Sequence, residues 1–200
     1  NNESLPIPVT WNITDEEIAK MYEGGVKTYE ITGVAGGLPA RCVVSMIKFN
    51  YVQNFGFEDG VTEPWQIDDR GGADQIYPEN KITDSLNGTW HMHFWSAAKD
   101  TIDFSLYQQV KDLPAGTYRF SISIMGGDAA DAEVFCYALV DGTEVGRTPM
   151  KITSYGEWDT QQVGGITVEA GQTVTVGISV KCAAGGAWGK IDDALLNSED

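Results

Sequence analysis

The chain has little positive charge, and this shortage excludes several classes of partner. Its 13 Lys and Arg residues stand against 29 Asp and Glu residues, so the formal net charge is −16. So acidic a surface repels nucleic-acid phosphates, anionic membranes and polyanionic substrates. Neutral glycans and cations such as Ca²⁺ remain compatible with it.

Long apolar runs, a basic leader and paired cysteines are also missing. No run approaches the roughly 20 apolar residues that span a bilayer, and the first residues do not resemble a secretory signal peptide, so we expect no membrane insertion. The three cysteines, Cys42, Cys136 and Cys182, are odd in number and have no CxxC spacing. A disulfide framework needs pairs and a zinc ribbon needs close pairs, so we expect all three to be structural thiols.

Signatures of catalysis are absent as well. The chain contains no GxSxG, HExxH or P-loop pattern. A glycosidase needs two carboxyl groups facing each other across a cleft. Most acidic residues here fall in turns instead, such as Asp68-Asp69 and Asp128 to Asp131. The sequence therefore predicts a protein that is not an enzyme.

Short alternating segments are what the chain does contain. Residues 118–124 and 174–180 each place apolar side chains at every second position, and each follows a turn that contains glycine. No long amphipathic helix interrupts this pattern. Strands at such intervals predict an all-β fold, a jelly-roll β-sandwich over residues 54–200.

A smaller β domain is expected before it, over residues 1–50. Strand-like stretches cover residues 7–11, 28–34 and 40–47, and residues 15–22 form a short helical or extended link with acids in its first turn. About 50 residues bury little core, so this piece is expected to depend on other parts of the protein.

This first piece resembles the C-terminal half of a group 4 bacterial immunoglobulin-like domain. The resemblance rests on Pro8-Val9-Thr10-Trp11, on residues 25–33 and on Val43-Val44. It implies a partial Ig-like spacer domain without chemistry of its own.

The segment Trp90 to Trp95 is the first candidate for ligand binding. Alternation places Trp90, Met92 and Phe94 on one apolar face and His91, His93 and Trp95 on the other. Rings with a polar edge suit sugars, which offer a weakly polar C–H face and hydroxyl groups. Two alternatives stay open: the three side chains lie beneath a loop, or the two histidines bind zinc together with a carboxylate.

Other outward aromatic and amide side chains extend this candidate set. In residues 104–109, Tyr107 and Gln109 lie opposite an apolar face. In residues 134–138, Tyr137 lies opposite another. Trp188 is flanked by glycines that would let a glycan approach. If these segments neighbour Trp90 to Trp95, they form one open face. The candidate carbohydrate-binding residues are His91, His93, Trp95, Tyr107, Gln109, Tyr137 and Trp188.

Two acidic motifs, Asn54 to Gly60 and Ala187 to Leu196, suggest a cation site. Glu58 follows at the end of a strand-like stretch in the first motif, and hydrophobic residues flank Asp192 and Asp193 in the second. Buried carboxylates are costly unless they pair or bind a cation, and Ca²⁺ prefers such oxygen ligands. The alternative is that these carboxylates are exposed or bind backbone amides.

Four motifs occur in an order that resembles the jelly-roll carbohydrate-binding modules of bacterial glycanases. They are Asn54 to Glu58, Leu113 to Tyr118, Gly156-Glu157-Trp158 and Ile191-Asp192-Asp193. The similarity is greatest to the galactan-binding (family 61) module of arabinogalactan endo-β-1,4-galactanases.

This resemblance implies structural calcium at Glu58 and Asp192, and a neutral polysaccharide ligand such as β-1,4-galactan. It also implies a secreted or cell-surface bacterial protein that carries other domains of the same glycanase. The competing hypothesis is a structural spacer or cell-surface interaction module without a glycan site.

Overall fold

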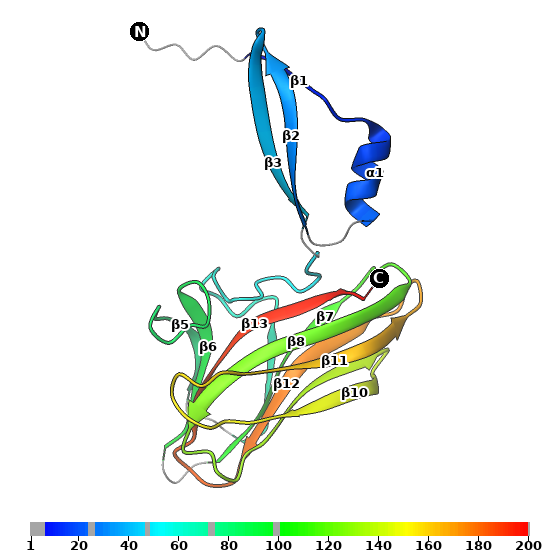
Figure 1. The fold of residues 1–200 in the computed structure, drawn as a ribbon. Helices are drawn as coiled ribbons and strands as arrows, with labels where there is room; N and C mark the ends of the chain where they lie inside the picture. Colours follow the sequence, from blue (N-terminus) through cyan, green and yellow to red (C-terminus); the bar gives the residue numbers. More distant parts are fainter. Residues whose placement is uncertain (1–6, 24–26, 47–48, 72–74, 98–100, 200) are drawn as a thin grey trace. The chain divides into compact units, whose positions relative to one another are not determined.

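The computed structural model describes residues 7–23, 27–46, 49–71, 75–97 and 101–199 (Figure 1). The chain divides into two compact units, Asn1–Lys48 and Phe49–Asp200. That the first unit is an immunoglobulin-like domain stays a prediction.

The first unit is a three-stranded antiparallel sheet with one helix. Its elements are β1 (Val9–Trp11), α1 (Asp15–Glu23), β2 (Lys27–Ala35) and β3 (Leu38–Met46), and the strand order is β1-β2-β3. The link after β1 is helical because Thr14 and Glu17 form a capping box. The Glu17 amide donates to Thr14 Oγ1 at 3.2 Å, and the Thr14 amide donates to Glu17 Oε2 at 2.8 Å.

This unit buries almost nothing. Of its described residues only Gly33 is buried, while Leu38 and Val43 are exposed. That the first piece depends on other parts of the protein for stability stays a prediction. No helix among the described residues is long and apolar enough to cross a membrane.

The second unit confirms the predicted all-β sandwich, with two five-stranded antiparallel sheets (Figure 1). Sheet I has the order β10 (Thr143–Met150), β9 (Glu133–Val140), β12 (Val174–Cys182), β7 (Ile102–Val110) and β4 (Gln66–Asp69). Sheet II has the order β11 (Asp159–Val168), β8 (Gly116–Gly127), β13 (Trp188–Ser198), β6 (Trp90–Trp95) and β5 (Gln75–Asn80). The chain passes repeatedly from one sheet to the other, as in a jelly roll.

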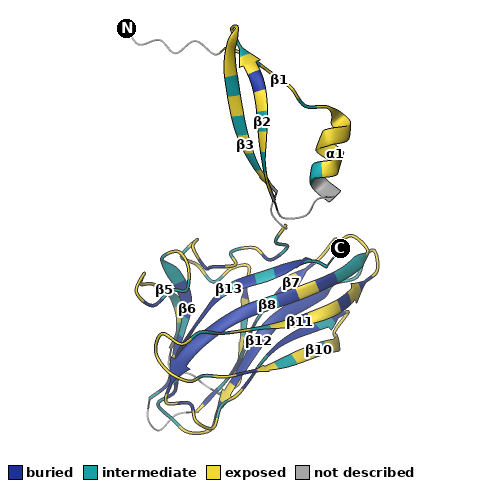
Figure 2. Cartoon of the chain, in the orientation of Figure 1, coloured by how far each residue is buried: buried dark blue, intermediate teal, exposed yellow. Residues whose placement is uncertain are grey.

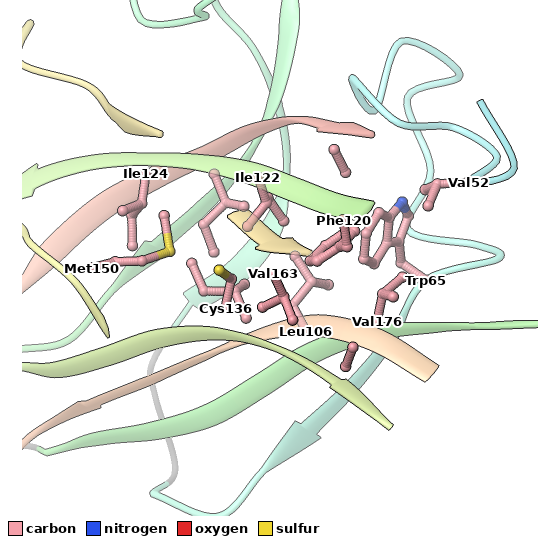
Figure 3. Packing of buried hydrophobic residues seen from close by; sticks show 14 of the residues in the cluster. Val52, Trp65, Leu106, Phe120, Ile122, Ile124, Cys136, Met150, Val163 and Val176 are labelled. Atoms are coloured by element: carbon pink, nitrogen blue, oxygen red, sulfur yellow. The ribbon is translucent and has the colours of Figure 1, made fainter. Parts of the chain in front are cut away.

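The core lies between the two sheets (Figures 2 and 3). Met92 and Phe94 of β6 and Leu106 of β7 are fully buried in it, which confirms the apolar faces predicted from alternation. Cys136 and Cys182 are buried as well, and burial raises the pKa of each thiol to about 11. Both are therefore unreactive structural thiols, as predicted.

Candidate functional site

The predicted site residues divide between the two sheets. β6 and β13, which carry the two histidines, Trp95 and Trp188, belong to sheet II, whereas β7 and β9 belong to sheet I (Figure 1). The outer faces of a sandwich point away from each other. The condition under which these side chains would form one open face, that β7 and β9 neighbour β6, is therefore not met. Alternation along a strand predicts which side faces the core, but not the sheet in which the strand lies.

Tyr107, Gln109 and Tyr137 come together on the outer face of sheet I, where they line a groove of about 820 Å³. Gly177 of β12 pairs with Tyr107 on one side and with Tyr137 on the other. Since glycine has no side chain, nothing from β12 separates the two rings. Along β7 the lining runs from Ser105 to Lys111, about 20 Å of strand. We call this feature the sheet I groove.

The sheet I groove presents hydroxyl, amide and ring surfaces. The Tyr107 hydroxyl donates to Gln66 Oε1 at 3.1 Å, and Gln109 is exposed. Tyr137 is only 9% exposed, and burial raises the pKa of its hydroxyl despite a hydrogen bond with Ser105. These neutral side chains suit a ligand that carries hydroxyl groups and weakly polar faces.

The carboxylates of the sheet I groove already have partners. Asp68 pairs with Arg70, which also binds Asp103 at 2.7 Å. The Asp141 side chain accepts the Thr173 amide at 2.9 Å and the Gln172 side-chain amide at 2.9 Å. Arg70 partly balances the charge of Asp68, whereas the donors to Asp141 are neutral amides that do not balance a charge.

The other predicted residues contribute to a second surface, on the outer face of sheet II. We call it the aromatic platform. It consists of Tyr77, His93, Trp95, Tyr155, Trp188 and Lys190.

Trp95 and Trp188 are direct cross-strand neighbours in β6 and β13. The Trp188 indole donates to Asp128 at 3.1 Å and lies over Gly127. A Cβ on Gly127 would be 2.8 Å from the indole, so glycine is required for this position of the ring. The tryptophan pair thus has a defined orientation at one end of the aromatic platform.

A network of charges lies under the aromatic platform. Lys190 is 4% exposed, contacts Glu79, and approaches His93 Nδ1 at 2.7 Å and Asp84 Oδ2 at 3.7 Å. Burial alone would raise the pKa of Asp84. Hydrogen bonds from Lys81, Thr83 and Tyr155 outweigh this effect and lower the pKa to about 2. Asp84 is therefore ionised and closely paired at neutral pH.

The two histidines have different positions in this network. His91 is fully buried, with Nε2 at 2.9 Å from Glu79 and Nδ1 at 3.0 Å from Ser85, so it lies beneath a loop and not on the surface. Burial lowers the pKa of His91. Burial, followed by the charge of Lys190, lowers the pKa of His93 to about 4. Both rings are neutral at pH 7.

Among the described residues, no group of three or more His, Cys, Asp and Glu side chains is arranged to hold a metal ion. The arrangement of His91 therefore matches the alternative of a residue under a loop better than that of a zinc ligand.

Glu58 and Asp192 both accept hydrogen bonds from backbone amides. Glu58 Oε1 accepts from Thr89 and Trp90, each at 2.9 Å. Asp192 is fully buried and accepts amides from Leu86 at 2.8 Å and from Asp193 at 2.8 Å. Despite these bonds, burial raises the pKa of Asp192 to about 7.

The carboxylates of Asp192 and Asp193 both lie near Gly56. A Cβ at this glycine would lie 3.6 Å from Asp192 Oδ1 and 3.9 Å from Asp193 Oδ1, so both carboxylates face the same point. Oxygen donors of this kind fit Ca²⁺. Asp193 was not among the predicted ligands, whereas the oxygens of Glu58 are directed to β6.

Sequence reasoning missed Tyr77, Glu79, Asp84, Tyr155 and Lys190. One signal was available, because Lys190 lies in a segment expected to be a core strand, and a buried cation there needs a partner. Asp84 and Tyr155 lie in loops, and no periodicity predicts where a loop residue packs.

Comparison with known proteins gives structural matches only: no family model and no curated protein sequence matches the chain. The structure is similar to that of TmCBM61 in complex with β-1,4-galactotriose. The TM-score is 0.66 and the identity 28%, over 76% of this chain and 99% of that one.

Two more distant matches share the fold alone. One is the enzymatically active domain of tailspike protein 4 from bacteriophage CBA120, with TM-score 0.58 and 10% identity over 78% of this chain and 22% of that one. The other is a structure of carbohydrate-binding modules of the β-sandwich superfamily, with TM-score 0.55 and 13% identity over 86% of this chain and 74% of that one. The second unit therefore has the jelly-roll fold of carbohydrate-binding modules and resembles a family 61 module, as predicted.

Proposed function

We propose that the chain is a noncatalytic carbohydrate-binding module that holds a neutral polysaccharide in the sheet I groove, with β-1,4-galactan as its ligand. The observation that carries this proposal is the groove of about 820 Å³ between Tyr107 and Tyr137, in a fold similar to a module bound to β-1,4-galactotriose.

Recognition would use stacking and hydrogen bonds together. The half-buried ring of Tyr107 offers an apolar face to the C–H groups of sugar rings, while the exposed Gln109 offers hydrogen-bonding groups to hydroxyls. The net charge of −16 disfavours acidic glycans. Because such open sites bury little area and flexible chains lose entropy on binding, the affinity per site should be modest.

The groove carboxylates support a noncatalytic role. Glycoside hydrolysis requires a general acid and a second carboxylate on opposite sides of the bond. Asp68 is held by Arg70, and Asp141 is held by Thr173 and Gln172, so each already serves a structural contact.

Isothermal titration against galactan, xylan, mannan, β-glucan and arabinan tests the proposal. We expect saturable heat with galactan, and about fivefold weaker binding for Tyr107→Ala, since an aromatic contact contributes about 1 kcal/mol. Phe55→Ala is the matched control, because Phe55 is exposed and belongs to neither surface. Binding to another glycan would reject galactan and keep the module class. Absence of heat with every glycan would favour the spacer hypothesis.

We also propose that Ca²⁺ binds at Asp192 and Asp193 beside Gly56, with Glu58 supporting the adjoining start of β6. The support is the buried Asp192 carboxylate, whose hydrogen-bond donors are neutral amides. A bound Ca²⁺ would supply the missing positive charge and join the 54–60 loop to β13.

Thermal melting with Ca²⁺ and with chelator tests this site. Ligand at 100 times its dissociation constant stabilises the fold by about 2.7 kcal/mol, so we expect a clear rise in melting temperature with Ca²⁺. Asp192→Asn should abolish the rise, whereas Asp112→Asn, at an exposed position, should keep it. An unchanged melting temperature in the unaltered protein would reject the calcium site.

The same proposal places the module in a secreted or cell-surface bacterial glycanase, with the first unit as an immunoglobulin-like spacer. Such a module concentrates its enzyme on the polysaccharide. Removing the module from the full-length protein should therefore lower activity on insoluble galactan more than activity on soluble galactan.

A further inference from the structure

We propose that the aromatic platform on sheet II is a second glycan-binding site, so that one module holds two polysaccharide chains at once. This inference rests on the proposed function and extends it from one site to two.

The side chains of the aromatic platform form a continuous series of contacts. The rings of Tyr77 and His93 are 5.0 Å apart, and His93 approaches Lys190 at 2.7 Å. On the other side, the ring of Tyr155 lies 6.4 Å from that of Trp188, which pairs with Trp95. Asp84 joins the two halves, 3.7 Å from Lys190 and 3.0 Å from the Tyr155 hydroxyl. The aromatic side chains thus surround a polar centre.

Three of these rings remain open to solvent. Tyr77 is 41% exposed, Trp95 37% and Tyr155 57%, although all belong to one surface. Exposed aromatic groups that gather in this way mark binding sites more often than scattered ones do. Beneath them, the paired charges of Lys190, Glu79 and Asp84 keep the surface in a defined shape, which lowers the entropic cost of binding.

The chemistry of the platform selects neutral glycans. Lys190 faces the carboxylates of Glu79 and Asp84, and Asp128 lies beside Trp188, so the surface carries more negative than positive charge. An acidic sugar would be repelled. His93 accepts at Nδ1 from Lys190, so its proton is on Nε2, where it can donate to a sugar hydroxyl.

The two surfaces cannot hold the same stretch of a chain. They belong to the outer faces of two stacked sheets, which point in opposite directions. A module with both sites would therefore join two polysaccharide chains, instead of gripping one chain twice.

Titration of the whole chain with β-1,4-galactotriose tests the inference, with turbidity of galactan solutions as a second readout. We expect two sites per chain in the unaltered protein. Combined Tyr77→Ala and Trp95→Ala should leave one site, and so should combined Tyr107→Ala and Gln109→Ala. Only the unaltered protein and the Phe55→Ala control should cross-link galactan and raise turbidity. Thermal melting confirms that each variant is folded.

The outcomes separate this inference from the proposed function. One site that the Tyr77 and Trp95 changes leave intact would overturn the second site and keep the groove. If the protein has one site and only the Tyr77 and Trp95 changes remove it, all binding takes place on the platform. This result would also overturn the two-site inference. Absence of any binding to galactotriose or galactan would reject the proposed galactan ligand itself.

Discussion

Replacing Asp84 by Asn should destabilise the fold by an amount that depends on pH. Asp84 lies in the network under the aromatic platform, with Lys81 Nζ at 2.9 Å, Tyr155 Oη at 3.0 Å and Lys190 Nζ at 3.7 Å. Its pKa is about 2, against 3.8 for an ordinary aspartate. This difference corresponds to about 2 kcal/mol in favour of the folded state at neutral pH.

The stabilisation by ionised Asp84 decreases as the pH falls, because folding lowers the pKa of this carboxyl group. Because the folded pKa is depressed, the contribution is complete above pH 3.8 and is lost as the pH falls through about 2. Asparagine keeps the shape and one oxygen acceptor but has no charge. At pH 7 we therefore expect Asp84→Asn to lower the free energy of unfolding by about 2 kcal/mol and the melting temperature by about 4–8 °C. At pH 3 the deficit should be about half as large.

Urea denaturation at pH 7 and thermal melting at pH 7 and pH 3 measure these values. Asp112→Asn is the matched control at an exposed site, and it should change stability by less than about 0.5 kcal/mol. A deficit that is equal at both pH values would refute the electrostatic reasoning, since it would show that packing or hydrogen-bond geometry was lost. Wild-type stability at pH 7 would refute it as well.

Three further perturbations test the platform and the core. The ring of His93 should titrate near pH 4 by NMR, because burial and Lys190 oppose its protonation. Its contribution to stability is then complete above pH 6.5 and is lost as the pH falls toward 4; titration near 6.5 would contradict its place in the network. Gly127→Ala should displace the Trp188 indole and cost about 1–3 kcal/mol, and an unchanged tryptophan fluorescence spectrum would count against this contact. Phe104→Ala should cost about 3–5 kcal/mol in urea denaturation, because the side chain is fully buried between the sheets; a loss below about 1 kcal/mol would show that this part of the core is loosely packed.

Local pattern predicted the elements and their faces well. Alternation in residues 90–95 placed Met92 and Phe94 in the core, and both are fully buried. The acids of residues 15–17 left a helical or an extended link open, and the capping box of Thr14 and Glu17 makes it helical. Such predictions succeed because the inside and the outside of a strand follow from the period of its own side chains.

Partners that are distant in sequence were beyond such reasoning. Lys190 meets Glu79, which lies 111 residues earlier, and no local pattern relates them. His91 looks like an outward residue, yet the loop that carries Ser85 covers it. A loop can cover one outward side chain and leave the next open, and this depends on tertiary packing.

The sequence by itself determined an acidic β-sandwich and its core faces, because composition and period are local properties. Four short motifs carried its resemblance to a galactan-binding module. Only the tertiary structure decided that Tyr107 and Tyr137 lie on one face and Trp95 and Trp188 on the opposite one. The order of strands in each sheet is set by contacts between distant segments, and the alternation of any single strand is the same in either sheet.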